Sequence, residues 1–307
     1  MINVAVVGVG YLGQHHARIL ASIPDCKLVG VVDVNKERAR QIAELYGTAS
    51  VDFPDIIGKV DAVSIAVPTI DHFMIASAFL NAGTHVLIEK PITATVEEAG
   101  ILIGLARSRG KVLFVGHTER FNPAFQAARE KIVNPGFIEA HRLGVFAKRS
   151  TDIDVVLDLM IHDIDIILSL VNDQIQSVDS IGVRALTDKV DIANARVRFK
   201  KGCVANITAS RISRDKVRKI RIFQPHSYIS IDCGEREAQH YYLVQDDAGE
   251  PQIKMEGLKI DADEPLRREI LSFLGSIQDG TPPEVSGEDG KRALELAFNI
   301  LEGMKKQ

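Results

Sequence analysis

Hydrophobic and polar positions follow two different patterns along this chain. In the first third, short apolar runs alternate with amphipathic stretches. Strands are predicted where β-branched residues gather, at residues 4–7, 27–33, 62–66, 85–88 and 112–115. Helices are predicted between them, among others at residues 12–22 and 36–46. Because strands that alternate with helices pair in parallel through right-handed crossovers, we expect an N-terminal α/β unit around a parallel sheet.

The pattern changes after about residue 118. A helix is predicted at 155–171, where isoleucine and leucine recur at helical spacing. Strands of alternating polarity then follow with almost no helix between them, at residues 180–185, 194–199, 204–210, 217–223, 228–232 and 240–244. Helices at 265–277 and 290–304 end the chain. This pattern predicts a C-terminal α+β unit with an open antiparallel sheet, one face of which is solvated or covered by a partner.

Length and composition set the domain count and exclude some partners. A chain of 307 residues accommodates two domains; we place them at 1–119 and 120–307, with the last helix as a candidate to pack back on the first domain. The net charge of −4 argues against nucleic acid, and no apolar run is long enough to span a bilayer. Three widely spaced cysteines without a CxxC pair predict free thiols in a reducing compartment. We therefore expect a cytoplasmic protein without a nucleic-acid or membrane partner.

A glycine motif joins the first predicted strand to the first predicted helix. Gly8, Gly10 and Gly13 form G-x-G-x-x-G, and Asp33 stands at the end of the next strand. Its carboxylate can accept hydrogen bonds from ribose hydroxyls and would repel a 2′-phosphate, and Asn35, not arginine, lies just beyond it. This context predicts a Rossmann domain that binds NAD, with the pyrophosphate at the helix N-terminus. The alternative is a glycine-rich turn in another Rossmann-like protein, such as an S-adenosylmethionine-dependent methyltransferase.

Residues that can bind a ligand follow three later strands of this domain. They are Pro68, Thr69 and His72 after the strand at 62–66, Glu89-Lys90-Pro91 after the strand at 85–88, and His117, Arg120 and Asn122 after the strand at 112–115. Open α/β sheets bind ligands at the carboxyl ends of their strands, so these positions are candidates for substrate or cofactor contacts. Lys90 can donate a hydrogen bond to a hydroxyl that becomes a carbonyl; the alternative is an ordinary exposed loop lysine.

The predicted helix at 155–171 carries a second candidate group. Asp158, His162 and Asp165 are spaced so that they share one helical face. Oxidation of an alcohol needs a base for the hydroxyl proton, and a histidine oriented by a carboxylate suits that task near neutral pH. A plain salt-bridged surface helix is one alternative. A metal site is the other, but no further ligand set accompanies it, so we expect no metal.

Together these motifs resemble the glucose-fructose oxidoreductase / inositol dehydrogenase / rhizopine catabolism (Gfo/Idh/MocA) family. The resemblance covers nearly the whole chain in order and rests on the glycine motif with His16 on the following helix, Ala66-Val67-Pro68 with His72, Glu89-Lys90-Pro91, and Asp158-x-x-x-His162. It implies an NAD-dependent dehydrogenase in which Lys90, Asp158 and His162 form the catalytic group beside the nicotinamide. Expected cofactor contacts are Gly8, Gly10, Tyr11, Leu12, Gly13, Asp33, Pro68, Thr69, His72, Glu89 and Lys90. Expected substrate contacts are Lys90, His117, Arg120, Asn122, Asp158 and His162.

Residues 116–123, 208–213 and 217–223 resemble a bacterial branch of this family that oxidises nucleotide sugars. The resemblance implies oxidation at C3 of UDP-N-acetylglucosamine to a 3-keto sugar for later transamination, as in lipid A biosynthesis, by a homo-oligomer (dimer or tetramer). The alternatives are a dehydrogenase of a free polyol such as an inositol, a non-catalytic NAD-binding regulator, and a redox-neutral glycosidase that keeps its NAD. A basic cluster could meet the diphosphate of such a substrate, or instead form a solvated sheet edge or a subunit contact. It consists of Arg211, Arg214, Lys216, Arg218, Lys219 and Arg221.

Overall fold

The chain divides into two compact units in the computed structural model, which describes residues 1–147 and 153–305. Unit 1 comprises residues 1–118 and 266–291, and unit 2 comprises residues 119–265 and the C-terminal residues from 292. The expected boundary at 119/120 therefore lies one residue from the observed one. The expected second domain, however, included 266–291, and these residues belong to unit 1. In the described part of the chain, no helix is both long and apolar enough to cross a membrane.

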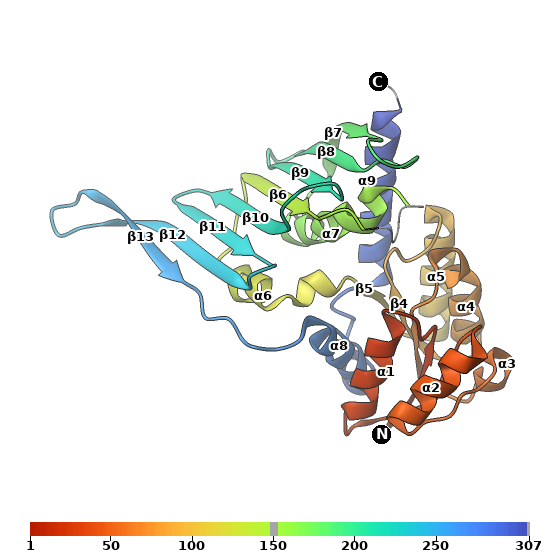
Figure 1. The fold of residues 1–307 in the computed structure, drawn as a ribbon. Helices are drawn as coiled ribbons and strands as arrows, with labels where there is room; N and C mark the ends of the chain where they lie inside the picture. The colour runs from red at the N-terminus through yellow and green to blue at the C-terminus, as the bar shows by residue number, and fades with distance from the viewer. Residues whose placement is uncertain (148–152, 306–307) are drawn as a thin grey trace. The chain divides into compact units, whose positions relative to one another are not determined.

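Unit 1 is built on a parallel sheet of five strands within its fully described residues, in the order β2-β1-β3-β4-β5. Figure 1 labels the strands β4 and β5 of this sheet, together with the helices of the unit. The strands are β1 (Ile2–Val7), β2 (Cys26–Val32), β3 (Ala62–Ile65), β4 (His85–Glu89) and β5 (Leu113–Gly116). Its helices are α1 (Gly13–Ser22), α2 (Lys36–Tyr46), α3 (Phe53–Ile56), α4 (Thr69–Asn81), α5 (Val96–Arg109) and α8 (Pro265–Asp279). A single parallel bridge between Val31 and Ser50 takes the place of a further edge strand beside β2. The predicted Rossmann-type sheet is confirmed, with strand ends shifted by one or two residues.

The strand order reverses between β1 and β3, which are neighbours in the sheet. Chains that leave adjacent parallel strands in opposite directions open a crevice outside the carboxyl ends of those strands, and ligands of such sheets bind there. The segments after β1 and β3 are the glycine motif and the Val67-Pro68 turn. The fold of unit 1 therefore places the predicted cofactor residues at its own ligand crevice.

Helix α8 returns to the first unit, and so does the first turn of the last helix, as the sequence suggested: a Cβ atom on Gly290 would lie 2.8 Å from Val115 of β5. Phe273 of α8 is buried, and its ring meets that of Phe114 in β5 edge to face, with centroids 5.9 Å apart. The backbone beyond α8 also joins unit 1, because the Val115 N–H donates to the Val285 carbonyl (3.1 Å). The rest of α9 (Gly287–Met304), from Arg292 on, contributes Leu296 and other apolar side chains to the core of unit 2.

Unit 2 holds one sheet of eight strands among its described residues, in the order β13-β12-β11-β10-β6-β9-β8-β7. The strands are β6 (Phe137–Leu143), β7 (Ile175–Val183), β8 (Ile192–Phe199), β9 (Val204–Ser210), β10 (Val217–Gln224), β11 (Ser227–Asp232), β12 (Glu237–Gln245) and β13 (Pro251–Gly257). The helical segments are the 3-10 turn η1 (Thr118–Phe121), α6 (Pro123–Arg129), the π-helical turn η2 (Val156–Met160), α7 (Ile161–Leu170) and most of α9. All strand pairs are antiparallel except β6 and β9, which are parallel.

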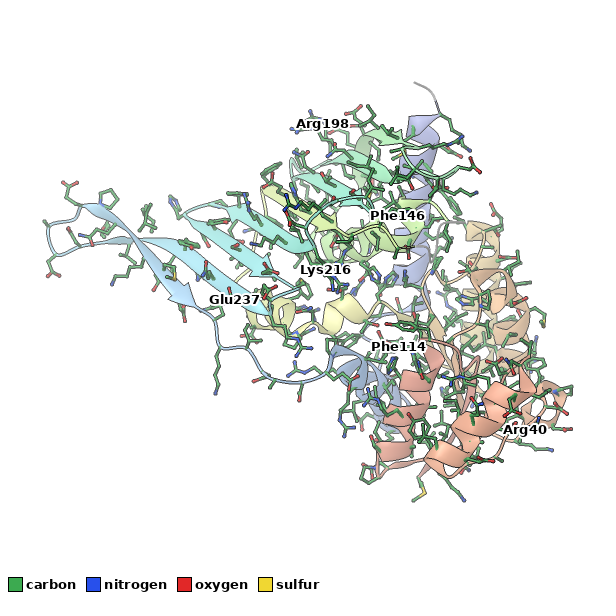
Figure 2. The ribbon with its side chains drawn as sticks, viewed as in Figure 1. Arg40, Phe114, Phe146, Arg198, Lys216 and Glu237 are labelled. Atoms are coloured by element: carbon green, nitrogen blue, oxygen red, sulfur yellow. The ribbon has the colours of Figure 1, made fainter. Side chains whose placement is uncertain are left out.

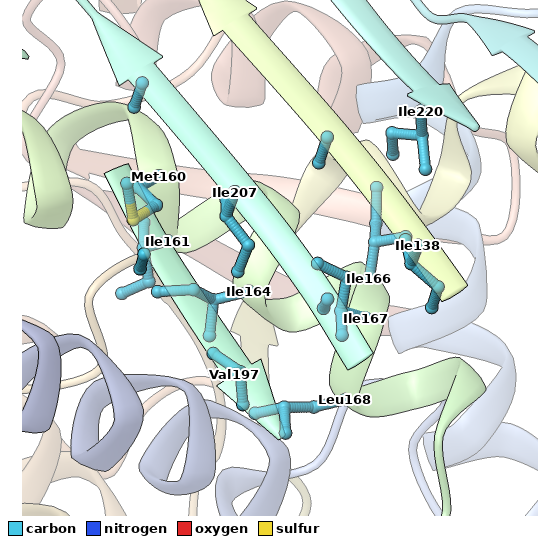
Figure 3. Close-up of a cluster of buried hydrophobic side chains, with 14 of the residues drawn as sticks. Ile138, Met160, Ile161, Ile164, Ile166, Ile167, Leu168, Val197, Ile207 and Ile220 are labelled. Atoms are coloured by element: carbon cyan, nitrogen blue, oxygen red, sulfur yellow. The ribbon is translucent and has the colours of Figure 1, made fainter. Parts of the chain in front are cut away.

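Helices cover one face of this sheet. Along β8 the burial alternates, so that Val197 is fully buried whereas its neighbour Arg198 is exposed (Figures 2 and 3). The buried face packs on α7, where Ile164 and Ile167 meet Ile207 of β9 (Figure 3). In the described part of unit 2 no helix packs on the opposite face. The predicted open antiparallel sheet is thus confirmed, except that β6 and β9 pair in parallel.

The sequence missed two strands of unit 2 and one irregularity in a helix. Strand β6 was missed because Arg142 occupies the inward-facing position that follows Ile138 and Ala140, which breaks the alternation of polarity. Strand β13 was missed because all its residues are exposed, so that its formation depends on pairing with β12. The helix predicted at 155–171 is confirmed in its extent, but it begins with the π-helical turn η2 before it continues as α7.

Candidate active site

The turn between β1 and α1 has a shape that only glycine can adopt. Gly8 has a φ of +85°, and a Cβ atom there would lie 2.6 Å from the Ala66 carbonyl oxygen. A Cβ atom on Gly13 would lie 1.7 Å from the Gly8 carbonyl oxygen, so the start of α1 packs directly on the turn. Gly10, in contrast, faces open space, with nothing within 4 Å of its Cβ position. The first and third glycines therefore hold the turn closed, and the second leaves room for a ligand to approach the backbone.

A pocket of about 450 Å³ adjoins this turn within unit 1. Most of its walls are apolar, and two carboxylates, Asp33 and Asp71, are the charged groups among its lining residues. The Asp33 carboxylate accepts hydrogen bonds from the backbone N–H groups of Val9 (2.8 Å) and Asn35 (2.9 Å), which fix its orientation. A pocket of this size, with apolar walls and an oriented carboxylate beside a glycine turn, fits the adenosine part of a dinucleotide.

Apart from Gly13, which begins α1 against the turn, the expected cofactor residues divide into three groups. Gly8, Gly10, Asp33 and Pro68 line the pocket. Tyr11 and Leu12 lie in the glycine turn with exposed side chains, and Thr69 begins α4. His72, Glu89 and Lys90 lie after β3 and β4 and are not among the residues that line this pocket.

His72 connects the loops that follow β3 and β4. It is buried, with Nδ1 2.9 Å from the Pro91 carbonyl oxygen and Nε2 3.0 Å from the Val67 carbonyl oxygen. Burial lowers the pKa of His72, although both carbonyl contacts oppose this shift. A neutral ring donates to one of the two carbonyls at a time. His72 therefore holds together the two backbone segments beside the ligand crevice. The sequence had suggested only a direct contact with the cofactor.

Glu89 anchors the backbone that carries Lys90. Its carboxylate lies 3.0 Å from His16 Nε2, whose Nδ1 lies 2.8 Å from the Ser64 hydroxyl, and it accepts the Lys90 N–H (3.2 Å). Burial alone would raise the pKa of Glu89, but the hydrogen bond and charge of His16 and the charge of Lys90 outweigh it and lower this pKa. The Lys90 side chain itself is half-buried, and the Lys90–Pro91 bond is cis. The backbone of Lys90 is thus held by the buried Glu89 carboxylate.

The second candidate group lies in unit 2, on η2 and α7. Asp158 belongs to the π-helical turn and His162 to the first turn of α7, and both are half-buried. Single π-helical turns inserted in α-helices occur frequently at functional sites. Asp165, which a straight helix would place on the same face, is instead buried and paired elsewhere. Of the three residues predicted to share a face, Asp158 and His162 are the two that remain accessible.

Two buried arginines neutralise the other carboxylates of α7. Arg120 of η1 contacts Asp165 through two nitrogens, each at 2.7 Å. Arg142 of β6 contacts Asp163 at 2.7 and 3.0 Å, and its third contact is to Glu119 at 3.2 Å. Burial alone would lower the pKa of Arg142, but the charges of Asp163 and Glu119 raise it above its ordinary value. These bidentate pairs attach α7 to β6 and to the start of unit 2 and thereby fix the rotation of the helix about its axis.

The expected substrate contacts His117, Arg120 and Asn122 are all buried. Arg120 is engaged with Asp165, as described above. The Asn122 side chain caps α6 by accepting the Ala124 N–H (3.1 Å) and donates to the Cys233 carbonyl (3.1 Å). Arg120 and Asn122 therefore have structural roles that the sequence did not reveal. An arginine and an asparagine after a strand look the same in the sequence whether they bind a ligand or the protein itself. Substrate binding by these residues stays a prediction.

The basic cluster in and before β10 is largely paired within unit 2. Arg218 contacts Glu119, Lys219 contacts Asp232 and Arg221 contacts Glu139, each at 3.3 Å. Arg211 is buried, donates to the Ile153 carbonyl and lies 3.8 Å from Asp191. These pairs favour the interpretation of the cluster as part of the sheet and its contacts over that of a diphosphate site.

Arg38 of α2 is a residue beside the cofactor crevice that the sequence pattern did not single out. Its Nε donates to the Val9 carbonyl (3.0 Å), and its Nη2 donates to Gln14 Oε1 (2.8 Å). No sequence signal distinguishes it from the other charged residues at the start of α2. The pairing of Asp163 and Asp165 with arginines, in contrast, could have been inferred from the sequence. Carboxylates among the isoleucines of a buried helix require buried cations beside them.

Comparison with known proteins identifies the relatives of both units. Residues 2–117 match a family described as an oxidoreductase family with an NAD-binding Rossmann fold. Residues 135–226 match the GFO/IDH/MocA C-terminal domain. The chain belongs to the Gfo/Idh/MocA family. It is therefore an oxidoreductase whose N-terminal domain binds NAD, and the residues around the glycine turn fit that cofactor.

Individual relatives span the whole chain. The UDP-N-acetylglucosamine 3-dehydrogenase of Acidithiobacillus ferrooxidans is 40% identical over 302 residues, which cover 97% of this chain and 96% of that protein. A solved structure of that enzyme matches with a TM-score of 0.93 and 38% identity, over 99% of this chain and 98% of the other. The myo-inositol 2-dehydrogenase of Thermotoga maritima is more distant, with 26% identity over 343 aligned positions that cover 100% of this chain and 97% of that protein.

Asp33→Asn is expected to change the choice of cofactor. It removes the negative charge that attracts ribose hydroxyls and repels a 2′-phosphate, so NADH should bind about tenfold more weakly and NADPH more tightly. Dissociation constants from NADH and NADPH fluorescence titrations test this. Glu44→Gln, which neutralises an exposed carboxylate of α2, is the control and should change neither constant. Unchanged affinities in Asp33→Asn would show that this carboxylate does not face the ribose.

Asp165→Ala is expected to destabilise unit 2, because it leaves Arg120 buried without its partner. The expected loss in the free energy of unfolding is about 3–5 kcal/mol, measured by urea unfolding followed by circular dichroism. The double variant Arg120→Met/Asp165→Leu should recover most of this loss, since it removes both charges of the pair. Glu139→Ala, which breaks the more exposed pair with Arg221, should cost at most about 1 kcal/mol. Equal losses in Asp165→Ala and Glu139→Ala would contradict the role given to the buried pair.

Proposed function

We propose that this protein oxidises the C3 hydroxyl of UDP-N-acetylglucosamine to a ketone, with NAD as the oxidant. The observation that carries the proposal is the 40% identity, along nearly the full length of both chains, to an enzyme named for this reaction. Inositol dehydrogenases, the alternative within the family, share less of the sequence at comparable coverage. The product, a 3-keto sugar nucleotide, is a substrate for transamination, which is the class of reaction expected to consume it.

The cofactor is assigned to unit 1. Gly8, Gly10 and Gly13 would bring the N-terminus of α1 to the pyrophosphate, and Asp33 would receive hydrogen bonds from the adenosine ribose. Bound NAD supplies the acceptor for the hydride that leaves C3. The open space at Gly10 and the oriented carboxylate of Asp33 support this assignment.

His162 is assigned the role of general base, and Asp158 that of the group that orients it. When the hydride leaves C3, the hydroxyl proton must also leave, and a histidine can accept it near neutral pH. Both side chains are half-buried, as groups that meet a substrate must be. The adjacent Asp163 and Asp165 are paired with arginines and do not compete for the histidine or for the substrate.

Lys90 is assigned the role of a hydrogen-bond donor to the oxygen that becomes the ketone. A positive donor stabilises the negative charge that develops on this oxygen as its proton leaves. Its backbone is held by the Glu89 carboxylate and by the His72 contact to Pro91, so the lysine extends from a fixed loop. Lys90 belongs to unit 1, and Asp158 and His162 belong to unit 2. Their joint role follows from the family resemblance.

The substrate and the catalytic roles can be tested together by NADH absorbance. Protein, NAD and a carbonyl trap are mixed with UDP-N-acetylglucosamine, UDP-glucose, free N-acetylglucosamine or myo-inositol, and only the first is expected to give a strong signal. His162→Asn should lower kcat by about 10²–10⁴-fold, the range for general acid–base catalysis, and Lys90→Met should also lower it. His226→Asn, at an exposed position with positive φ that asparagine tolerates, is the control. A signal with inositol or free sugar alone would contradict the nucleotide-sugar substrate, and full activity of His162→Asn would contradict its role.

The open face of the unit 2 sheet is assigned as a contact between copies of this chain. One row of side chains crosses six neighbouring strands, each directly opposite the next. The row runs through Met255, Tyr241, Tyr228, Phe223, Phe137 and Val204. Phe223 and Tyr228 stack with centroids 4.8 Å apart, and Phe223 is 37% and Met255 58% exposed. Exposed apolar surface of this extent is typical of subunit contacts.

Phe223→Glu is expected to lower the molar mass of the assembly in solution, because it places a charge in the middle of the apolar row. Light scattering during size-exclusion chromatography measures that mass. Ile101→Glu, at an exposed apolar position on α5 of unit 1, is the control and should leave the mass unchanged. A wild-type mass of one chain, or the same oligomer in Phe223→Glu, would contradict this contact.

A further inference from the structure

Side chains from α1, from α2 and from the residue after β2 enclose the glycine turn in a continuous set of hydrogen bonds. The Asp33 carboxylate accepts the Val9 N–H at 2.8 Å, and Arg38 Nε donates to the Val9 carbonyl at 3.0 Å. Arg38 Nη2 then donates to Gln14 Oε1, and Gln14 Nε2 donates to the Tyr11 carbonyl at 3.1 Å. The two peptide groups that flank Val9 are therefore each held by a side chain from outside the turn.

The start of α2 fixes the position of Arg38 in turn. Asn35 caps this helix by accepting the Arg38 N–H at 3.0 Å, and its own N–H donates to Asp33 at 2.9 Å. The backbone of Arg38 is thus tied to the residue that is assigned to the ribose. The Arg38 side chain is half-buried and directs its donors to a carbonyl and to an amide oxygen of the turn region. A lysine could reach one of these acceptors, but the two together require the fork of a guanidinium.

We propose that Arg38 is a positioning residue for the dinucleotide, which holds the glycine turn in the shape that binds the pyrophosphate. The turn offers its backbone at Gly10, where the structure leaves open space. Gly10 has no side chain to restrict its backbone conformation. Arg38 and Asp33 instead form hydrogen bonds to the backbone of the adjacent residue, Val9. A turn that is already in its binding shape does not lose conformational entropy when the ligand arrives. Arg38 thereby raises affinity without a need to touch the cofactor.

The proposal predicts a loss that depends on the phosphates of the ligand. Arg38→Met keeps the aliphatic stem and removes both donors, so NADH should bind about tenfold more weakly, the ratio expected when one or two hydrogen bonds no longer order the turn. Adenosine, which lacks the pyrophosphate, should bind Arg38→Met as it binds the wild type. Dissociation constants are measured by NADH fluorescence and by displacement with adenosine. The melting temperature without any ligand is recorded for each variant.

Matched variants separate positioning of the turn from simple charge attraction and from a general loss of stability. Arg40→Met changes an exposed arginine on the same helix that contacts Glu37 at 3.3 Å, and it should bind NADH as the wild type does (Figure 2). Arg38→Lys keeps the positive charge but not the fork, and it should lose affinity as Arg38→Met does. Gln14→Ala removes the partner of Nη2 alone and should give a smaller loss in NADH affinity; it also serves if Arg38→Met fails to fold.

The outcomes decide between three roles for this side chain. Weaker NADH binding in Arg38→Met and Arg38→Lys, with adenosine binding unchanged, supports the positioning role. Full affinity in Arg38→Lys would overturn it in favour of simple attraction between charge and phosphate. A lower melting temperature with unchanged NADH affinity would also overturn it, since Arg38 would then stabilise only the fold. These measurements require no sugar substrate, so their result is independent of the proposed reaction.

Discussion

The close approach of backbone to backbone at the β1–α1 turn is the constraint on which the cofactor side of this protein depends. A single added carbon at Gly13 would lie 1.7 Å from the Gly8 carbonyl oxygen, so α1 can begin where it does only because both positions lack a side chain. That contact directs the free N–H groups of the helix N-terminus towards the crevice between β1 and β3. Asp33 and Arg38 then hold Val9 from both sides, one at its N–H and the other at its carbonyl.

In unit 2 the corresponding constraint is the burial of charged side chains. Helix α7 carries His162, Asp163 and Asp165 within a mainly isoleucine and leucine sequence, and both carboxylates are directed into the interior. A buried carboxylate is tolerated only with a cation beside it, and two arginines, Arg120 and Arg142, provide these at 2.7 Å. The pairs set the rotation of α7, and with it the direction of His162. The same helix thus separates structural acids from the accessible histidine that is assigned to catalysis.

The two units were predictable to different degrees because their strands are buried in different ways. The strands of unit 1 are covered on both faces and read as apolar runs, so their positions and parallel pairing follow from pattern alone. In unit 2, Arg142 interrupts the inward-facing row of β6, and β13 shows no buried residue. The allocation of α8 to unit 1 was also beyond the pattern, since an amphipathic helix does not specify which core its apolar face will join.

The sequence by itself determined the glycine motif, the acid at the end of β2, the loop at Lys90 and the Asp158–His162 spacing. These features are local, so neighbouring residues and their backbone preferences are enough to define them. Only the tertiary structure decided which partners the charged side chains take: Arg120 faces Asp165 across 45 residues of chain, and Arg38 reaches back 29 residues to Val9. An arginine looks the same in the sequence whether its side chain binds a substrate or a buried carboxylate. The difference arises when folding removes water from the group and leaves one partner within reach.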